Sequence, residues 1–189
     1  MSQREISICV FCGARSGNDP FWTELAAGFG ARLAERGIGL VYGGGRVGLM
    51  GALASGALAA SGRVVGVIPR SLLSRELAHD GLTELQVVDD MATRKVRMLE
   101  QSDAFVALPG GLGTLDELFE VLTLGQIGTH SKPSALLDAR GYWQPLVGAL
   151  QAMVQAGFVR PQDLGELLVQ ADPSVLIDKL LARLAAPAS

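Results

Sequence analysis

The stretch that decides the fold of this chain is Ala104-Phe-Val-Ala-Leu108-Pro109-Gly110-Gly111-Leu112-Gly113-Thr114-Leu115-Asp116-Glu117. Its first five residues are continuously apolar, which predicts a buried β-strand. A helix is expected after it, because apolar residues then recur at helical spacing. A glycine-rich turn therefore joins the end of a strand to the start of a helix. Free backbone N–H groups and the positive end of the helix dipole meet at such a turn, and both favour an anion such as phosphate.

Two carboxylates follow this turn, Asp116 and Glu117, and we expect both in the first turn of the helix. A carboxylate beside a bound phosphate repels it, so these acids serve another purpose. One interpretation is a capping box, in which Thr114 and Glu117 bond to backbone amides at the helix start. The other is a role for Glu117 in chemistry. The motif alone leaves both open.

Composition predicts one globular domain covering residues 1–189, because 49% of the residues are hydrophobic and 19% are charged. The net charge of −3 argues against nucleic acid as a partner. No window offers ~18 unbroken apolar residues, so no membrane association is expected. No signal peptide is visible at the N-terminus, which predicts a cytoplasmic protein.

The two cysteines, Cys9 and Cys12, are spaced C-x-x-C. They fall at the end of an apolar strand, where residues three apart point to opposite faces. The chain also lacks the second pair that a zinc site needs. We therefore expect neither redox chemistry nor a metal site.

Strands and helices alternate along the chain with short connections. Strands are expected at 6–12, 38–42, 64–68, 85–88, 104–108, 134–137 and 167–169, and helices at about 20–36, 49–60, 91–101, 142–155 and 174–184, besides the helix after the glycine turn. This alternation predicts a parallel sheet with helices on both faces. Ligands of such sheets bind outside the carboxyl ends of the strands, where an irregular segment at 69–84 is a candidate site loop.

A second glycine-rich turn, Gly43-Gly44-Gly45, follows the second strand. Gly43-x-Gly45-x-x-Gly48 formally matches the dinucleotide fingerprint, but no acid ends the next strand, so NAD is not expected. The turn either serves a tight strand–helix connection or brings Gly44 and Gly45 against a phosphate or ribose.

The helix expected at 91–101 carries three cations within four positions. We expect Ala92, Val96 and Leu99 to form its core stripe, which places Arg94 on a different face. Arginine suits bidentate contact with a phosphate or another oxyanion.

Taken together, these motifs resemble the LOG (Lonely Guy) family of cytokinin riboside 5′-monophosphate phosphoribohydrolases, formerly labelled possible lysine decarboxylases. The resemblance covers about residues 6–160, and its specificity lies in the combination of an arginine–lysine pair with the glycine-rich motif. The matching segments, in the family's order, are Val10-Phe-Cys-Gly13, Val41-Tyr-Gly-Gly-Gly45, Gly48-Leu-Met-Gly51, Met91-x-x-Arg94-Lys95, Pro109-Gly-Gly-x-Gly-Thr-x-x-Glu117 and Lys132-Pro133.

The resemblance implies a single-domain α/β protein with a Rossmann-like parallel sheet. It implies hydrolysis of the N-glycosidic bond of adenosine 5′-monophosphates, N6-modified or not, to ribose 5-phosphate and a free base, cytokinin or adenine. It assigns catalysis to Arg94 and Glu117, needs no cofactor, and implies a homodimer. The residues implied to contact the substrate are Glu76, Lys95, Gly110, Gly111, Leu112, Gly113, Thr114 and Thr123, beside Gly44 and Gly45 from the second turn.

Two departures from the family pattern, Ala14 and Leu124, bear on base specificity. Pyridoxal phosphate is not expected, because none of the three lysines has a Schiff-base context. The alternative function is a non-catalytic carrier of a nucleotide or of molybdenum cofactor, since proteins with a similar fold and glycine loop bind such molecules.

Overall fold

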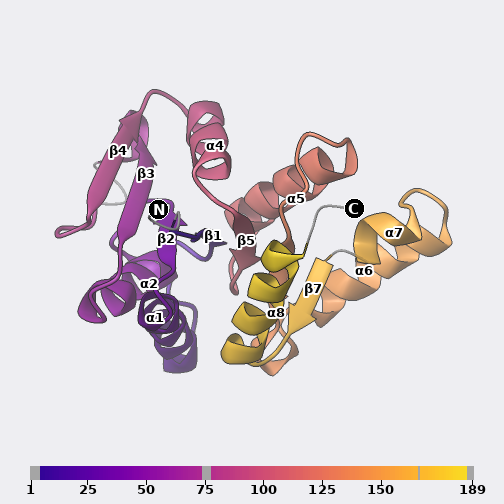
Figure 1. Cartoon of the computed structure of the whole chain (residues 1–189), viewed down its shortest axis with the longest axis horizontal. Coiled ribbons are helices and arrows are strands. Elements are labelled where there is room, and N and C mark those ends of the chain that lie inside the picture. The colour runs from indigo at the N-terminus through magenta and orange to yellow at the C-terminus, as the bar shows by residue number, and fades with distance from the viewer. Residues whose placement is uncertain (1–4, 74–77, 166, 187–189) are drawn as a thin grey trace.

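The sheet of the computed structural model, which describes residues 5–73, 78–165 and 167–186, has seven parallel strands in the order β4-β3-β2-β1-β5-β6-β7 (Figure 1). This confirms the predicted parallel α/β sheet. Its strands are β1 (Ser7–Phe11), β2 (Gly39–Tyr42), β3 (Val64–Pro69), β4 (Glu84–Val88), β5 (Ala104–Ala107), β6 (Ser134–Leu137) and β7 (Leu167–Gln170).

Helices cover both faces of the sheet, as predicted (Figure 1). One layer holds α1, α2 and α8, and the other holds α4, α5 and α6. The α-helices are α1 (Pro20–Glu35), α2 (Gly48–Ala59), α4 (Met91–Glu100), α5 (Leu112–Gln126), α6 (Gln144–Gln155), α7 (Pro161–Gly165) and α8 (Pro173–Ala185).

Strand β1 shows why the two layers form, because its apolar side chains alternate between them. Ile8 and Cys12 join the core under α1 and α2, whereas Cys9 and Phe11 join the core under α4. The two cysteines are thus buried, free thiols on opposite faces, as predicted. Burial is the main cause of the raised pKa of the Cys12 thiol, with a smaller contribution from the Glu117 carboxylate.

The order of the strands reverses between β1 and β5, the central pair of the sheet. Open α/β sheets form a ligand crevice at such a point. There the loop after β1 meets the glycine turn after β5, since the Gly13 N–H donates to the Pro109 carbonyl at 3.1 Å. The topology therefore places the deciding stretch of sequence at the switch point.

The start of α5 corrects one sequence interpretation. Its N-cap is Gly111, and the helix begins at Leu112, because the Leu115 N–H already donates to the Gly111 carbonyl at 3.1 Å. Thr114 is therefore inside the helix and buried, so the capping box is wrong. Glu117 falls in the second helical turn, beyond the uncapped amides.

The face that α4 buries also differs from the prediction. Of the predicted core stripe, Leu99 packs against the core. Arg94 and Met98 are the buried residues of this helix, whereas Val96 is 53% exposed and Ala92 is exposed as well. The reason is that backbone carbonyls bind the Arg94 guanidinium, which lets a cation replace an apolar side chain against the sheet. Met98 packs beside it among buried residues of β1 and β5.

Other boundaries agree with the predictions within about two residues, and β6 matches at both ends. Within the described ranges, no helix combines the length and the apolar character needed to cross a membrane.

Candidate functional site

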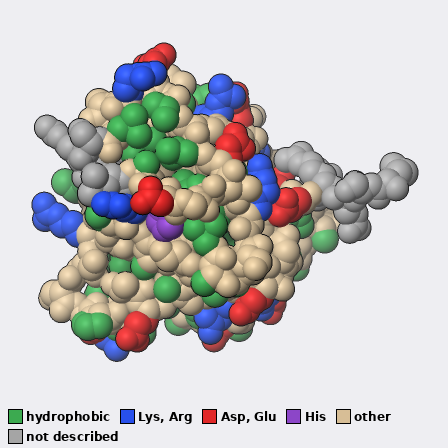
Figure 2. All heavy atoms as spheres, turned by 90° about the vertical axis from the view of Figure 1, so that its left-hand side faces the viewer, with side chains coloured by type: hydrophobic (Ala, Val, Ile, Leu, Met, Phe, Trp, Pro, Cys, Tyr) green, Lys and Arg blue, Asp and Glu red, His purple; other side chains and the backbone are tan. Residues whose placement is uncertain are grey.

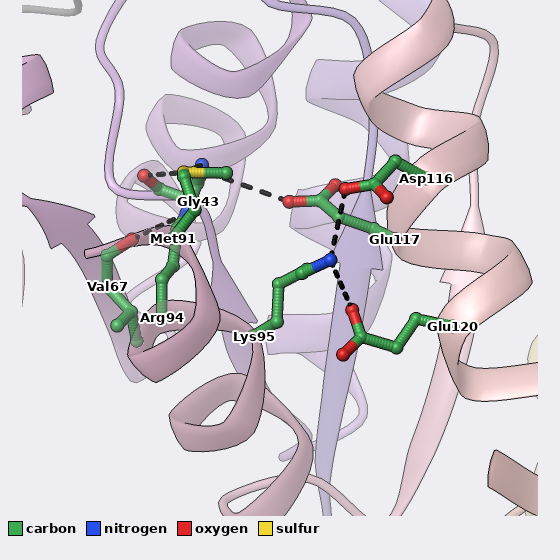
Figure 3. Close-up of polar contacts among 8 residues, drawn as sticks. All are labelled: Gly43, Val67, Met91, Arg94, Lys95, Asp116, Glu117 and Glu120. Carbon is green, nitrogen blue, oxygen red and sulfur yellow. Dashed lines mark hydrogen bonds and ion pairs between the residues drawn. The ribbon is translucent and has the colours of Figure 1, made fainter.

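Arg94 extends from α4 to the carboxyl ends of β2 and β3, where it is 4% exposed (Figure 3). Its Nε donates to the Val67 carbonyl and its Nη2 to the Gly43 carbonyl, both at 3.1 Å. Its Nη1 lies 3.5 Å from the sulfur of Met91. Two carbonyls thus fix the guanidinium, and among the described residues the third nitrogen has a weak acceptor, the sulfur of Met91.

The glycine turn Gly43–Gly45 is shaped by this arginine. A Cβ at Gly43 would overlap Nη2 of Arg94 and would lie 2.9 Å from the sulfur of Met50. Gly44 has a φ of +80°, a conformation that side chains disfavour. The structure therefore supports the tight-turn interpretation of this segment, and contact of Gly44 and Gly45 with a ligand stays a prediction.

Glu117 faces Arg94 from α5, with Oε1 3.9 Å from Nη2 (Figure 3). The side chain of Glu117 is 12% exposed, and that of Arg94 is 5% exposed. The pair thus brings together the two residues that the sequence assigned to catalysis. In a largely water-excluded position such charges act strongly on a bound molecule.

Lys95 follows Arg94 on α4 and bonds to two other carboxylates of α5 (Figure 3). Its Nζ lies 2.6 Å from Glu120 Oε2 and 3.2 Å from Asp116 Oδ2. The pKa of Lys95 is raised, first by the hydrogen bond that its ammonium group donates to Glu120. The predicted substrate contact of Lys95 would have to form beside this ion pair.

A cavity of about 300 Å³ opens between α4 and α5 beside Glu117. Apolar side chains line most of it, and its charged lining residues are Lys95, Glu100, Glu117 and Glu120. Its apolar lining comes from Phe11, Val96, Met98, Leu99, Val121 and Leu124. Such a combination of an apolar wall and a few polar groups is typical of a small-molecule site.

The glycine turn Gly110–Gly113 differs from the turn Gly43–Gly45. Gly110 is packed, because a Cβ there would overlap the hydroxyl of Thr114. In contrast, a Cβ at Gly111 or Gly113 would meet no heavy atom within 4 Å among the residues the structure describes. The hydroxyl of Tyr142 donates to the Gly110 carbonyl at 2.6 Å and fixes the packed end of the turn.

Among the described residues, no side chain caps the start of α5, whose N-cap residue is Gly111. In this it is like the starts of α2 and α6 and unlike those of α1, α4 and α8. At the start of α4, for example, the Asp90 side chain accepts a hydrogen bond from the Thr93 N–H at 2.7 Å. The first amides of a helix have no partner within the helix. Those of α5 are thus suited to a bound anion.

One predicted contact residue lies apart from this arrangement. Thr123 is exposed on α5 and does not line the cavity. Glu76 lies outside the described residues. Leu112, at the mouth of the turn, is 85% exposed.

Three residues of the site had no contact or role assigned to them from the sequence, namely Asp116, Glu120 and Tyr142. The i, i+4 spacing of Asp116 and Glu120 could have indicated a shared partner for the two carboxylates. Nothing local in the sequence points Tyr142 at the glycine turn. Among the described residues, no group of three or more His, Cys, Asp or Glu side chains could hold a metal ion.

The fold and the site define a class of α/β protein, with a ligand crevice at the switch point and a buried arginine–glutamate pair beside it. A family model described as "Possible lysine decarboxylase" matches residues 50–180. The chain belongs to this family, the LOG family whose motifs it carries.

Curated relatives agree with this assignment. The chain is 48% identical over 167 residues to a cytokinin riboside 5′-monophosphate phosphoribohydrolase of Rhodococcoides fascians, a match that covers 88% of the chain and 84% of the relative. It is 46% identical over 174 residues to a probable enzyme of the same name from Oryza sativa subsp. japonica, which covers 92% and 71%.

Among solved structures, the molybdenum cofactor binding protein of Rippkaea orientalis has a similar fold. The TM-score is 0.73 at 24% identity, and the match covers 97% of this chain and all of the other. At that identity the likeness concerns the fold alone.

Proposed function

We propose that this protein hydrolyses the N-glycosidic bond of adenosine 5′-monophosphates, including N6-modified ones, and releases the free base and ribose 5-phosphate. The observation that carries the proposal is the buried Arg94–Glu117 pair beside an uncapped glycine turn. The names of relatives up to 50% identical support the same reaction.

The turn Gly110–Gly113 is suited to the 5′-phosphate. Glycine at positions 111 and 113 has no steric reason within the described protein, but it lets a ligand approach the backbone closely. The first amides of α5 then donate to phosphate oxygens. Fixing the phosphate also fixes the ribose relative to Glu117.

Glu117 acts on the ribose. Breaking the glycosidic bond builds positive charge on the sugar, which a carboxylate near C1′ stabilises. The same carboxylate can orient or deprotonate the attacking water. Its place in the second helical turn, facing Arg94, separates it from the first amides of the helix. A phosphate at those amides and an acid at the sugar are therefore compatible.

Arg94 supports the reaction in two ways. The carbonyls of Val67 and Gly43 hold it rigid, so its charge needs little reorganisation during the reaction. Its Nη1, whose partner in the described part of the chain is the sulfur of Met91, is the nitrogen available to a substrate oxygen or to the departing base. The apolar cavity beside Glu117 can receive the base and its N6 substituent.

The contacts of the lysines argue against the decarboxylation that the family description names. Lys95 is paired with Asp116 and Glu120, and Lys132 donates to the Leu99 carbonyl at 2.7 Å. Lys179 is exposed on α8. A Schiff base with pyridoxal phosphate needs a lysine that is available in the site.

Two further proposals concern the assembly and its location. Hydrophobic side chains gather on the side of the molecule that carries β4 and α4 (Figure 2). Exposed residues there include Leu85, Val87, Met91 and Val96. Such a patch suits an interface, and we propose a homodimer in the cytoplasm. Light scattering tests the assembly, since a species of 19.8 kDa would be a monomer.

The reaction is tested by incubating the protein with AMP and with N6-prenylated AMP and separating the products. Release of free base and ribose 5-phosphate in equal amounts is expected, with Glu117→Gln as the inactive control. Stoichiometric binding of the nucleotide without cleavage would instead indicate the carrier function.

A further inference from the structure

The charges between α4 and α5 are unequal in number. Three carboxylates of α5, those of Asp116, Glu117 and Glu120, face two cations of α4, Arg94 and Lys95. The contacts divide them unevenly. Lys95 lies within 3.2 Å of both Asp116 and Glu120, whereas the partner of Glu117 is Arg94 at 3.9 Å.

This division matters because neighbouring carboxylates disfavour each other's ionisation, and a cation bound to one of them reduces that effect. Glu120 lines the same cavity as Glu117, one helical turn further along α5. Its partner Lys95 is 21% exposed and Glu120 itself 33% exposed. The pair is therefore partly shielded from solvent and is screened less by salt than a surface pair.

We propose that Lys95 is a positioning residue, which neutralises Asp116 and Glu120 and so leaves Glu117 ionised beside Arg94. This inference rests on the proposed function of Glu117. It differs from the expectation that Lys95 contacts substrate, because the ammonium group already serves two carboxylates in the structure.

Among the described residues, the other groups near Glu117 do not replace Lys95 in this role. Glu100 of α4 also lines the cavity, but it is a further carboxylate, paired with Arg97. On β1, Cys9 and Cys12 interact with Glu117, but burial raises the pKa of both thiols, so they stay neutral. On α4, Arg94 is held by the carbonyls of Val67 and Gly43 and cannot move to Glu120 without breaking those bonds. Lys95 is thus the cation that compensates the two additional carboxylates.

The test is the pH dependence of kcat for AMP in Lys95→Gln. Without the ammonium group, Glu117 takes up its proton at a higher pH, and the acid limb moves up by about one unit. On that limb kcat then falls about tenfold and recovers at higher pH. KM for AMP stays within about twofold, because uniform binding of the substrate is not lost.

A second variant separates charge from contact. In Lys95→Gln/Glu120→Gln the excess negative charge is partly removed, so the acid limb should return toward the wild-type position. Lys95→Arg keeps the positive charge, so the acid limb should stay at the wild-type position. Arg97→Gln is the matched control on the same helix, since among the described residues Arg97 pairs with Glu100, at 3.7 Å and with both side chains largely exposed.

The proposal is overturned if Lys95→Gln raises KM for AMP severalfold at every pH while the acid limb stays in place, because Lys95 then binds the substrate. It is also overturned if Glu120→Gln brings no recovery in the double variant while both variants melt at the wild-type temperature. Wild-type activity is measured in the same experiment. Its absence would refute the proposed function, whereas its presence with an unmoved limb refutes only the role of Lys95.

Discussion

The two glycine-rich turns of this protein look alike in sequence and differ in space. The turn Gly43–Gly45 after β2 is crowded, because the guanidinium of Arg94 occupies the place where a Gly43 side chain would begin. The turn Gly110–Gly113 after β5 is packed only at its first glycine. At Gly111 and Gly113 the added atom would meet nothing else in the described protein.

The difference shows that glycine at a strand end has two physical causes. In the crowded turn it makes room for a side chain of the protein itself, and in the open turn we propose that it makes room for a ligand. Both turns serve the same pair of residues, since one holds Arg94 and the other precedes Glu117 on α5. Variants of the pair and of each turn should therefore behave differently.

The largest effect is expected for Glu117→Gln, which removes the negative charge that faces Arg94. Turnover of AMP should fall by at least ~10²-fold, as is typical when an acid–base group is lost. The melting temperature should change little, because the capping role that would link Glu117 to helix stability is absent from the structure. Steady-state kinetics and thermal melting check the two effects. A lower melting temperature with normal turnover per folded molecule would contradict the assignment.

Gly43→Ala should damage the crowded turn. The added methyl group displaces Arg94 from the Gly43 carbonyl and should destabilise the protein by about 1–3 kcal/mol, the usual cost of overpacking. Turnover should fall with it, since the Arg94–Glu117 geometry is lost. Urea unfolding and AMP kinetics measure both. An unchanged midpoint would show that the turn is less crowded than the structure indicates.

Gly113→Ala should have the opposite signature in the open turn. Alanine in the first turn of α5 should keep or raise stability, by up to about 0.4–1 kcal/mol, because it restricts the unfolded chain. The methyl group should nevertheless obstruct the phosphate and raise KM for AMP by about tenfold, a loss of about 1.4 kcal/mol of binding. The same urea and kinetic measurements apply. A drop in stability without a change in KM would contradict this, because Gly113, like Gly43, would then serve packing within the protein and not a ligand.

Tyr142→Phe should give the smallest effect. It removes the hydroxyl that donates to the Gly110 carbonyl but keeps the ring packed against Trp22 and Trp143. Because Tyr142 is 40% exposed, water can replace the lost donor. The cost should be about 0.5–1.5 kcal/mol, the net value of one hydrogen bond, and should appear mainly in KM for AMP. An unchanged KM would mean that this bond does not position the turn.

The sequence predicted the architecture because apolar strands and glycine turns are local signals. The predictions were wrong where contacts with residues distant in the sequence decided the structure instead of the local pattern. The predicted core face of α4 was wrong because an arginine is expected at the surface. Arg94 is buried instead, since the carbonyls of Val67 and Gly43 accept hydrogen bonds from it. The capping box was wrong because α5 begins at Leu112, three residues earlier than a Thr114 cap allows it to begin.

The site was predictable in part. Arg94 and Glu117 came from the family motif, and the structure places them 3.9 Å apart. Tyr142 reaches the Gly110 carbonyl across 32 residues of sequence, and Lys95 reaches Glu120 across the gap between two helices. Such long-range contacts leave no periodic pattern, so only the folded chain reveals them.

The account as a whole depends on the open turn binding the 5′-phosphate, and the direct measurement is kcat/KM for AMP against that for adenosine. The two substrates share the bond that breaks and differ only in the phosphate. We expect AMP to be cleaved at least ~10²-fold better, because binding energy from this remote group lowers the barrier as well as KM. Equal values for AMP and adenosine would contradict the account.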